Sequence, residues 1–181
     1  MNEGVPPEGW SYRKLGDVAN IILGQSPSSE TYNEVRLGLP FYQGKADFGN
    51  HYPKTRYWCS EPKKVAPKNS ILFSVRAPVG DINITRHKSC IGRGLSAFNG
   101  RSIEQGFLYQ SLQLVKPKFQ LIAQGSTFEA VNGSDLKEFC LPLPPLPEQK
   151  KIAKILTSVD EVIETTETQI NKLKDLKKAM M

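Results

Sequence analysis

The stretch YQGKADFGNHYPKTRYW, residues 42–58, concentrates side chains that suit binding to nucleic acid. Cationic side chains pair with phosphates, and amide or guanidinium groups match the hydrogen-bonding edges of bases. Two glycines and a proline predict a loop. We expect this loop to read bases and grip phosphates through Gln43, Lys45, Asn50, His51, Lys54 and Arg56. The alternative is that its five aromatic residues fasten the loop to a core and that its cations are merely solvated.

Further candidate contacts with nucleic acid follow along the chain. Arg76 is one of them, although Asp81 could hold it in a salt bridge, and we favour that structural role. Four basic residues that follow Arg76 are expected on the same face as the loop. Farther along the chain, GSTFEAV, residues 125–131, offers small hydroxyl groups that suit a phosphate. A turn into a short strand is the alternative for GSTFEAV. These candidates are Arg86, His87, Lys88, Arg93, Ser126 and Thr127.

The positive charge of the chain is concentrated in one window. Residues 45–101 hold eleven Lys/Arg and three Asp/Glu, a net charge of +8 in a chain whose formal net charge is +6. Such a concentration favours a polyanion as the partner. A solvated basic face is the alternative that charge alone leaves open.

The sequence lacks the motifs of enzymes that modify or cleave nucleic acid. It has no GxxxxGK[ST] loop and no Asn/Asp-Pro-Pro-aromatic motif with a cofactor-binding glycine motif. No carboxylate cluster suits nuclease metals, and His51 and His87 are isolated. The cysteines, Cys59, Cys90 and Cys140, lack zinc-site spacing. We therefore expect no catalytic residue, metal or cofactor, and reduced thiols.

Length and composition indicate one domain with an appendage, because 181 residues suffice for a sizeable core and an extension. No apolar run approaches the roughly 20 residues that span a bilayer. The first ten residues, MNEGVPPEGW, lack the apolar stretch of a signal peptide. We expect a cytoplasmic protein that binds no membrane.

Residues 1–140 predict a mixed, strand-rich α+β domain, because they combine glycines with short apolar runs. Ser70–Val75 and Asp81–Thr85 predict two strands, joined by the turn APVG. Residues 89–100 predict a strand pair or a bulged strand, since their glycines permit unusual dihedral angles.

Helical spacing of apolar residues predicts a helix over residues 104–123, which Pro117 ends or breaks. A short capped turn follows, with Ser134 as a possible N-cap.

The prolines of LPLPPLPEQ, residues 141–149, mark a boundary. They exclude a helix interior or a central strand and favour an extended, semi-rigid polyproline II segment. We divide the chain into a globular domain over 1–140, a Pro-rich linker over 141–147 and a long helix over 148–181.

The final helix carries an apolar stripe with the 4-3 spacing of a coiled coil, from residue 152 to residue 180. A helix of about 33 residues is about 50 Å long, more than the width of the domain before it. We expect much of the stripe to pair with another helix, while packing back on its own domain is the alternative. The pairing residues are Ile152, Leu156, Val159, Ile163, Ile170 and Leu173.

Four segments, in this order, resemble the specificity (S) subunits of type I DNA restriction-modification systems. GWSYRKLGDVANIILGQSP resembles the opening of their target recognition domains. SVRAPVGDINIT and then CIGRGLSAF resemble their central motif. GSTFEAVNGSDLKEFCLPLPPLPEQKKIAKIL resembles the junction with their spacer helix. The likeness covers almost the whole chain.

The resemblance implies a non-catalytic subunit that recognises half of a bipartite double-stranded DNA target. It also implies modification subunits that bind this chain and methylate DNA, and restriction subunits that join through the complex. Family members typically carry two recognition domains and two helices in an antiparallel coiled coil, whereas this chain has one of each. A half-subunit that associates with a copy of itself and an N-terminal fragment both fit that departure.

A different class of function stays open beside this one. The chain would then be a non-catalytic assembly protein whose helix oligomerises and whose head binds protein or RNA. A DNA-recognition domain should bind with strongly salt-dependent affinity and should prefer one duplex sequence. A head that binds protein should show neither property strongly.

Overall fold

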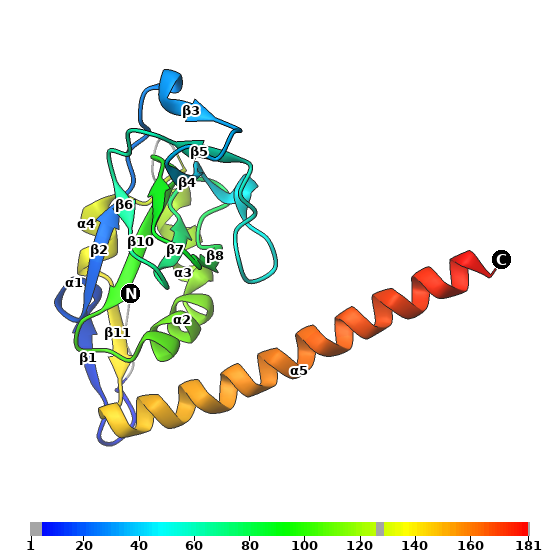
Figure 1. The fold of residues 1–181 in the computed structure, drawn as a ribbon. Coiled ribbons are helices and arrows are strands. Elements are labelled where there is room, and N and C mark those ends of the chain that lie inside the picture. Colours follow the sequence, from blue (N-terminus) through cyan, green and yellow to red (C-terminus); the bar gives the residue numbers. More distant parts are fainter. Residues whose placement is uncertain (1–4, 126–128, 181) are drawn as a thin grey trace.

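The computed structural model describes residues 5–125 and 129–180, which form a globular head and one long projecting helix (Figure 1). The head combines sheets with short helices, and its buried apolar residues form one large cluster and two small ones. This confirms the α+β class that the sequence predicts.

The sheet at the centre of the head is antiparallel and has the strand order β2-β10-β7-β8. Its strands are β2 (Ala19–Leu23), β7 (Ile71–Ser74), β8 (Ile82–Ile84) and β10 (Leu95–Gly100). The apolar run of β7 is buried throughout, as expected for a strand with neighbours on both sides. The predicted strand pair around APVG is confirmed, because β7 pairs with β8 across that turn.

A second sheet covers the upper part of the head in the order β3-β5-β4-β9-β6. Its strands are β3 (Tyr32–Asn33), β4 (Leu39–Tyr42), β5 (Tyr57–Cys59), β6 (Val65–Ala66) and β9 (Ser89–Ile91). The expectation that residues 89–100 form a pair of strands with each other is wrong, since β9 and β10 belong to different sheets. Gly92 and Gly94 make this change of sheet possible, because a Cβ at either would meet Gln43 within 2.6 Å.

Helices α2 (Gln105–Leu114) and α3 (Lys116–Gln124) replace the single helix predicted over 104–123. The predicted break is confirmed, because Pro117 lies in the first turn of α3, where its missing N–H costs nothing. Phe119 of α3 packs edge-on against Phe73 of β7, with ring centroids 5.1 Å apart. The two helices thereby close one face of the core.

Helix α4 (Gly133–Glu138) is capped by Asn132, so the prediction of Ser134 as the N-cap is wrong. The Oδ1 atom of Asn132 accepts hydrogen bonds from the backbone N–H groups of Ser134 and Asp135, at 2.8 and 3.0 Å. Asp135 bonds back to the N–H of Asn132, which completes a reciprocal cap.

The proline stretch is part of the head and is not an isolated polyproline spacer. Its first residues form β11 (Cys140–Leu143), which pairs with β1 (Ser11–Lys14), next to the short helix α1 (Leu15–Val18). A strand tolerates Pro142 here because β11 has β1 as its neighbour in a two-stranded sheet and needs no further backbone donor. The chain then enters α5 at Leu146, with a proline in the first helical turn.

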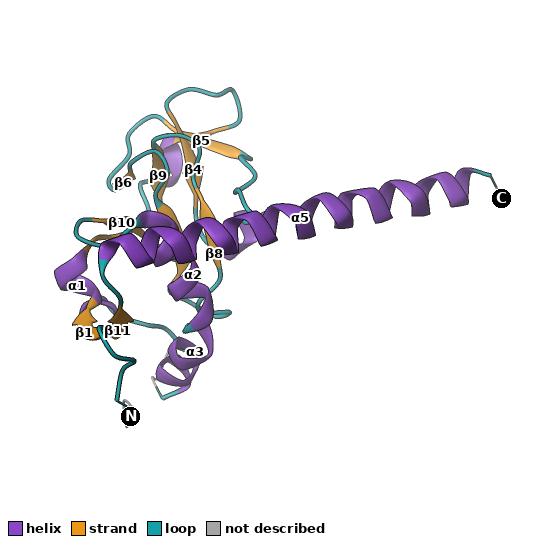
Figure 2. Ribbon diagram, turned by 90° about the horizontal axis from the view of Figure 1, so that it is seen from below, coloured by secondary structure: helices purple, strands orange, loops and turns teal. Residues whose placement is uncertain are grey.

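Helix α5 (Leu146–Ala179) is one continuous helix of 34 residues. It packs along α2 near its start and then leaves the head (Figure 2). Gln149 anchors this start, because its side chain donates to the carbonyl of Pro144 and accepts from the N–H of Glu104. Beyond Asp160, whose carboxylate accepts a hydrogen bond from Gln110, every described side chain of α5 is exposed.

None of the helices in the described ranges is both long enough and apolar enough to cross a membrane.

Candidate nucleic-acid interface

An open groove of about 730 Å³ brings together five of the candidate residues from three separate segments. One wall is the β4–β5 connection, and the other walls are the β7–β8 turn and the β9–β10 connection. The candidates that line it are Gln43, Lys45, Arg56, Arg76 and Arg93. Four cations and one amide around a single depression form a surface that suits a phosphate-bearing ligand.

Asp47 organises the wall of this groove. Its side chain is only 5% exposed. One carboxylate oxygen accepts two hydrogen bonds from the Arg56 guanidinium, at 3.2 Å from Nε and 2.5 Å from Nη2. The other oxygen accepts the backbone N–H groups of Gln43 and Gly44, at 2.7 and 3.4 Å. A single buried carboxylate therefore fixes both the backbone at Gln43 and the side chain of Arg56.

The side chain and the backbone carbonyl of Gln43 are also held by groups outside its own loop. Its Nε2 donates to the hydroxyl of Ser26 at 3.0 Å, and its backbone carbonyl accepts from the N–H of Gly94 at 3.2 Å. The same hydroxyl lies 3.3 Å from the backbone N of Arg93. Ser26 thus joins the two connections that carry Gln43 and Arg93.

Asp81 lies at the edge of the groove between two lysines. It forms ion pairs with Lys45 and with Lys116 of α3. Burial alone would raise the pKa of Asp81, but the hydrogen bonds and charges of Lys116 and Lys45 outweigh it, so that the pKa is lowered. The expected Arg76–Asp81 salt bridge is therefore wrong, because the two lysines occupy this carboxylate.

Six other candidates lie away from the groove lining. His51 packs against Tyr52 and Tyr109 beside α2, with its Nδ1 atom 3.2 Å from the Tyr109 hydroxyl. The guanidinium of Arg86 lies 3.7 Å from the centre of the Tyr52 ring, a cation–π contact. The exposed side chains in the loops around these two are Asn50, Lys54, His87 and Lys88. Ser126 and Thr127 lie outside the described residues.

Two of the five aromatic residues of the 42–58 stretch take the fastening role that we kept as an alternative. Tyr42 is buried and its hydroxyl lies 2.8 Å from that of Thr55. Phe48 packs partly buried against a small apolar cluster that includes Tyr42. Tyr57, in contrast, is 42% exposed. The two readings of the stretch are therefore compatible, since Tyr42 and Phe48 fasten the loop and some of its cations line the groove.

Sequence reasoning missed Ser26, Asp47 and Lys116. Asp47 ends the short 3-10 turn Lys45–Asp47 and accepts the backbone N–H of Gly44, three residues before it. Glycine has no side chain to complete a capping box, so this spacing gave no clear sequence signal. Ser26 and Lys116 reach the groove only through tertiary packing, and no local pattern marks them.

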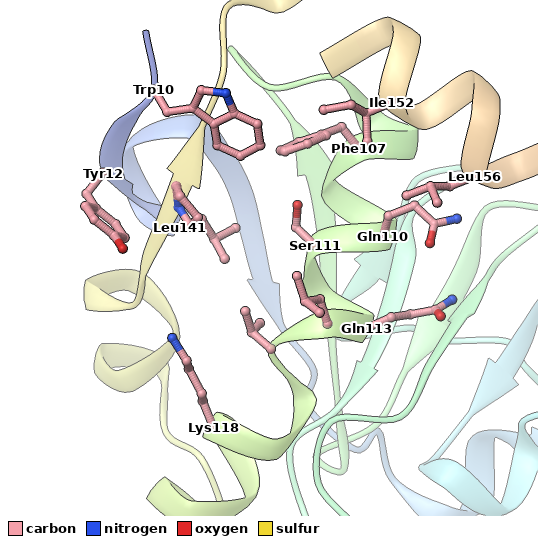
Figure 3. A pocket seen from close by; sticks show the side chains of 13 residues that line it. Trp10, Tyr12, Phe107, Gln110, Ser111, Gln113, Lys118, Leu141, Ile152 and Leu156 are labelled. Atoms are coloured by element: carbon pink, nitrogen blue, oxygen red, sulfur yellow. The ribbon is translucent and has the colours of Figure 1, made fainter. Parts of the chain in front are cut away.

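An apolar hollow of about 710 Å³ lies between α2, the β1–β11 pair and the base of α5 (Figure 3). Trp10 stands at its rim beside Phe107, with ring centroids 6.4 Å apart, and its indole donates to Glu148 at 3.3 Å. Ile152 and Leu156 of α5 point into the hollow, and Leu114 on its wall is 81% exposed. The hollow offers apolar surface. Among the described residues it shares no cation with the groove, and the one cation that lines it is Lys118.

The apolar stripe of α5 continues outward from this hollow without cover. Ile152 is partly buried against the head core, whereas the other five predicted pairing residues are between 38% and 65% exposed. They are Leu156, Val159, Ile163, Ile170 and Leu173. A row of exposed aliphatic side chains on a projecting helix is typical of a helix that packs against a second helix.

Residues 7–175 match the family model described as "Type I restriction modification DNA specificity domain". The chain is 43% identical to the putative type I restriction enzyme MjaX specificity subunit of Methanocaldococcus jannaschii. That match covers 98% of this chain and 43% of the relative. The MjaIX specificity subunit of the same organism is 27% identical over 92% of this chain and 41% of its own length.

Solved structures give the same result. The HsdS subunit from Thermoanaerobacter tengcongensis superposes with a TM-score of 0.79 at 42% identity, over 91% of this chain and 41% of that one. A chain from a study of complex assembly and conformational transition of the type I R-M system gives 0.82 at 44% identity, over 91% and 42%. The chain thus spans about two fifths of the length of the relatives that it matches.

Proposed function

The chain belongs to the type I restriction-modification DNA specificity domain family, and from this premise we propose that it recognises half of a bipartite double-stranded DNA target. Its relatives are named as specificity subunits, in agreement with the expectation of a non-catalytic chain. In our proposal residues 1–140 form the recognition domain, residues 148–181 the spacer helix, and 141–147 the connection between them.

One observation carries the assignment of DNA recognition to the head. Candidates that are far apart in the sequence, Gln43, Arg56, Arg76 and Arg93, line one groove. Duplex DNA needs cations for its phosphates and fixed donors or acceptors for its base edges, and the groove offers both. Arg86 and Lys88 are exposed outside the groove, and we propose that they contact phosphates of a longer duplex.

We further propose that α5 pairs with the α5 of a second copy of the chain. The support is its exposed apolar stripe and its continuity, through Leu156, with the apolar hollow. In an antiparallel pair the far end of the second helix lies beside the near end of the first, where it would cover that hollow. A two-fold pair requires an inverted-repeat target, because the symmetry of a dimer is imposed on its DNA.

The assembled pair would present two recognition heads to modification subunits, and through them to a restriction subunit, in the cytoplasm. The long helix suits a spacer, since it sets a fixed distance between two heads. This part of the proposal rests on the family and on the exposed stripe.

Selection from a pool of random duplexes tests the recognition proposal. The purified chain, alone and with its modification subunit, is expected to enrich a short motif and to lose affinity steeply as salt is raised. Enrichment of no motif in either state would contradict the proposal. Retention of single-stranded RNA or of proteins in place of duplex DNA would favour the assembly protein.

A further inference from the structure

The geometry of the groove wall points to one base contact: we propose that Arg56 reads a guanine in the half-site, with Asp47 as its positioning residue. This inference rests on the proposed recognition of DNA by the groove. It names which side chain reads a base, which base it reads, and which residue sets its orientation.

The donors of Arg56 are divided between the protein and the groove. A guanidinium carries five N–H groups in one plane. The Nε edge is used, since Nε and Nη2 donate to the same oxygen of Asp47 at 3.2 and 2.5 Å. Nη1 and the outer hydrogen of Nη2 form a second, parallel pair of donors. The Arg56 side chain is 56% exposed, so this outer edge is open to a ligand in the groove that Arg56 lines.

Asp47 makes this outer edge rigid. Its carboxylate is 5% exposed and cannot follow the arginine, because its other oxygen is bound to the backbone of Gln43 at 2.7 Å. A side chain fixed before binding loses little rotamer freedom on contact with DNA. Its two donors also keep one direction, which matters for a base edge and matters less for a phosphate.

The other cations of the groove differ from Arg56 in this respect. Lys45 is held by Asp81 and presents a point charge. Within the described part of the chain, the side chains of Arg76 and Arg93 form no ion pair, and both are exposed. Unrestrained arginines adapt to the varying positions of phosphates, and we assign the phosphate contacts to these two.

The donor pattern selects guanine among the bases. Guanine presents two acceptors, O6 and N7, side by side in the major groove, and these match two parallel N–H donors. Adenine places an amino donor beside N7, cytosine presents an amino donor, and thymine offers one acceptor beside a methyl group. Arginine has no acceptor to offer those donors, so each of these bases leaves at least one Arg56 donor without a partner.

Base preference of matched variants tests the assignment, because a structural or purely electrostatic role does not change preference at one position. Wild type, Arg56→Ala, Arg56→Lys, Asp47→Asn and the control Arg76→Ala are taken through the same selection from random duplexes. We expect wild type to require guanine at one position of the motif. Arg56→Ala should reduce discrimination there by roughly 10- to 100-fold and leave the other positions unchanged.

The remaining variants separate charge from geometry. Arg56→Lys keeps the charge but not the fork, so it should also lose the guanine preference. Asp47→Asn should weaken that preference partially, because an amide still accepts one bond from Arg56. Arg76→Ala should lower affinity for all sequences alike and keep the motif.

Two failures are distinguishable. If wild type selects a motif and both Arg56 variants select the same motif with uniformly lower affinity, Arg56 is a phosphate contact and this inference is wrong, while the proposed function stands. If wild type selects no motif, alone or with its modification subunit, the proposed function itself fails.

Discussion

The groove of the head and the apolar stripe of α5 differ in whether their side chains have partners within the described chain. In the groove, Arg56, Gln43 and Lys45 already have partners within the head, through Asp47, Ser26 and Asp81. On α5 the aliphatic side chains beyond the first turns have no cover in the described chain, and their exposed fractions reach 65%. The polar side chains of the groove are therefore held in place by the head itself, whereas the stripe of α5 has nothing of the described chain packed on it, and our proposal assigns that place to a second helix.

The largest effect is expected from a charge placed in the stripe. Ile163→Glu should break the helix pair, because each copy would bury a carboxylate without a partner, at a cost of several kcal/mol. Sedimentation equilibrium over a range of concentrations measures the change in association. Thr165→Glu is the matched control, since residue 165 is exposed and lies outside the stripe. An Ile163→Glu variant that associates like wild type would contradict the assignment of the stripe as the pairing surface.

Removal of the carboxylate that organises the groove is expected to have the next largest effect. Asp47→Ala leaves the N–H of Gln43 and the fork of Arg56 without their acceptor, which should lower the free energy of unfolding by about 1–3 kcal/mol. Urea denaturation of the head measures this loss. Lys54→Ala, a change to an exposed side chain in the same loop, should have almost no effect. Equal losses for the two variants would mean that the groove is not preorganised by Asp47.

A smaller, pH-dependent effect is expected at Asp81. Its pKa is lowered in the folded chain from an ordinary value of 3.8. Its contribution to stability is therefore present above that value and is lost as pH falls through the lower folded value. Asp81→Asn should be less stable than wild type by about 1–2 kcal/mol near neutral pH, with the difference shrinking as pH falls below the ordinary value of 3.8. A difference in stability that stays constant with pH would mean that the ion pairs of Asp81 with Lys45 and Lys116 do not stabilise the fold.

The smallest effect is a difference in alkylation rate between two cysteines of the head, neither of which lines the groove. Burial, with a smaller contribution from Cys59, raises the pKa of Cys90 to about 12. Cys140 is only half-buried. Alkylation of the native chain near neutral pH should label Cys140 first, because the reactive species is the thiolate. Mass spectrometry of peptides measures the labelling rate of each cysteine. Equal rates for Cys90 and Cys140 would contradict this prediction and would show that the second sheet opens readily.

The long helix was predictable because its 4-3 spacing is local and spans nine positions, of which all but Thr166 and Lys177 are apolar. The turn APVG and the break at Pro117 were predictable for the same reason, since proline and glycine act on their own neighbourhood. The partner of Asp81 was not predictable, because Lys45 and Lys116 are 36 and 35 residues away from it in sequence and meet it only in the packed head.

The proline stretch shows where local reasoning went too far. Four prolines predicted an extended, semi-rigid linker, and local reasoning could not foresee that pairing of β11 with β1, more than 120 residues apart in sequence, holds the start of that extended stretch to the head. Likewise, the sequence could not divide the eleven described candidates by position, and only the fold separated the five that line the groove from the other six.

The methylome of a host that expresses the chain with its modification subunit tests the central claim most directly. The wild-type chain should produce newly methylated sites that share a split motif with inverted halves. A variant with Arg56, Arg76 and Arg93 changed to alanine should produce none of them, although it still assembles with the modification subunit. Methylation of the same motif by that variant would contradict the account, because recognition would then reside outside the groove.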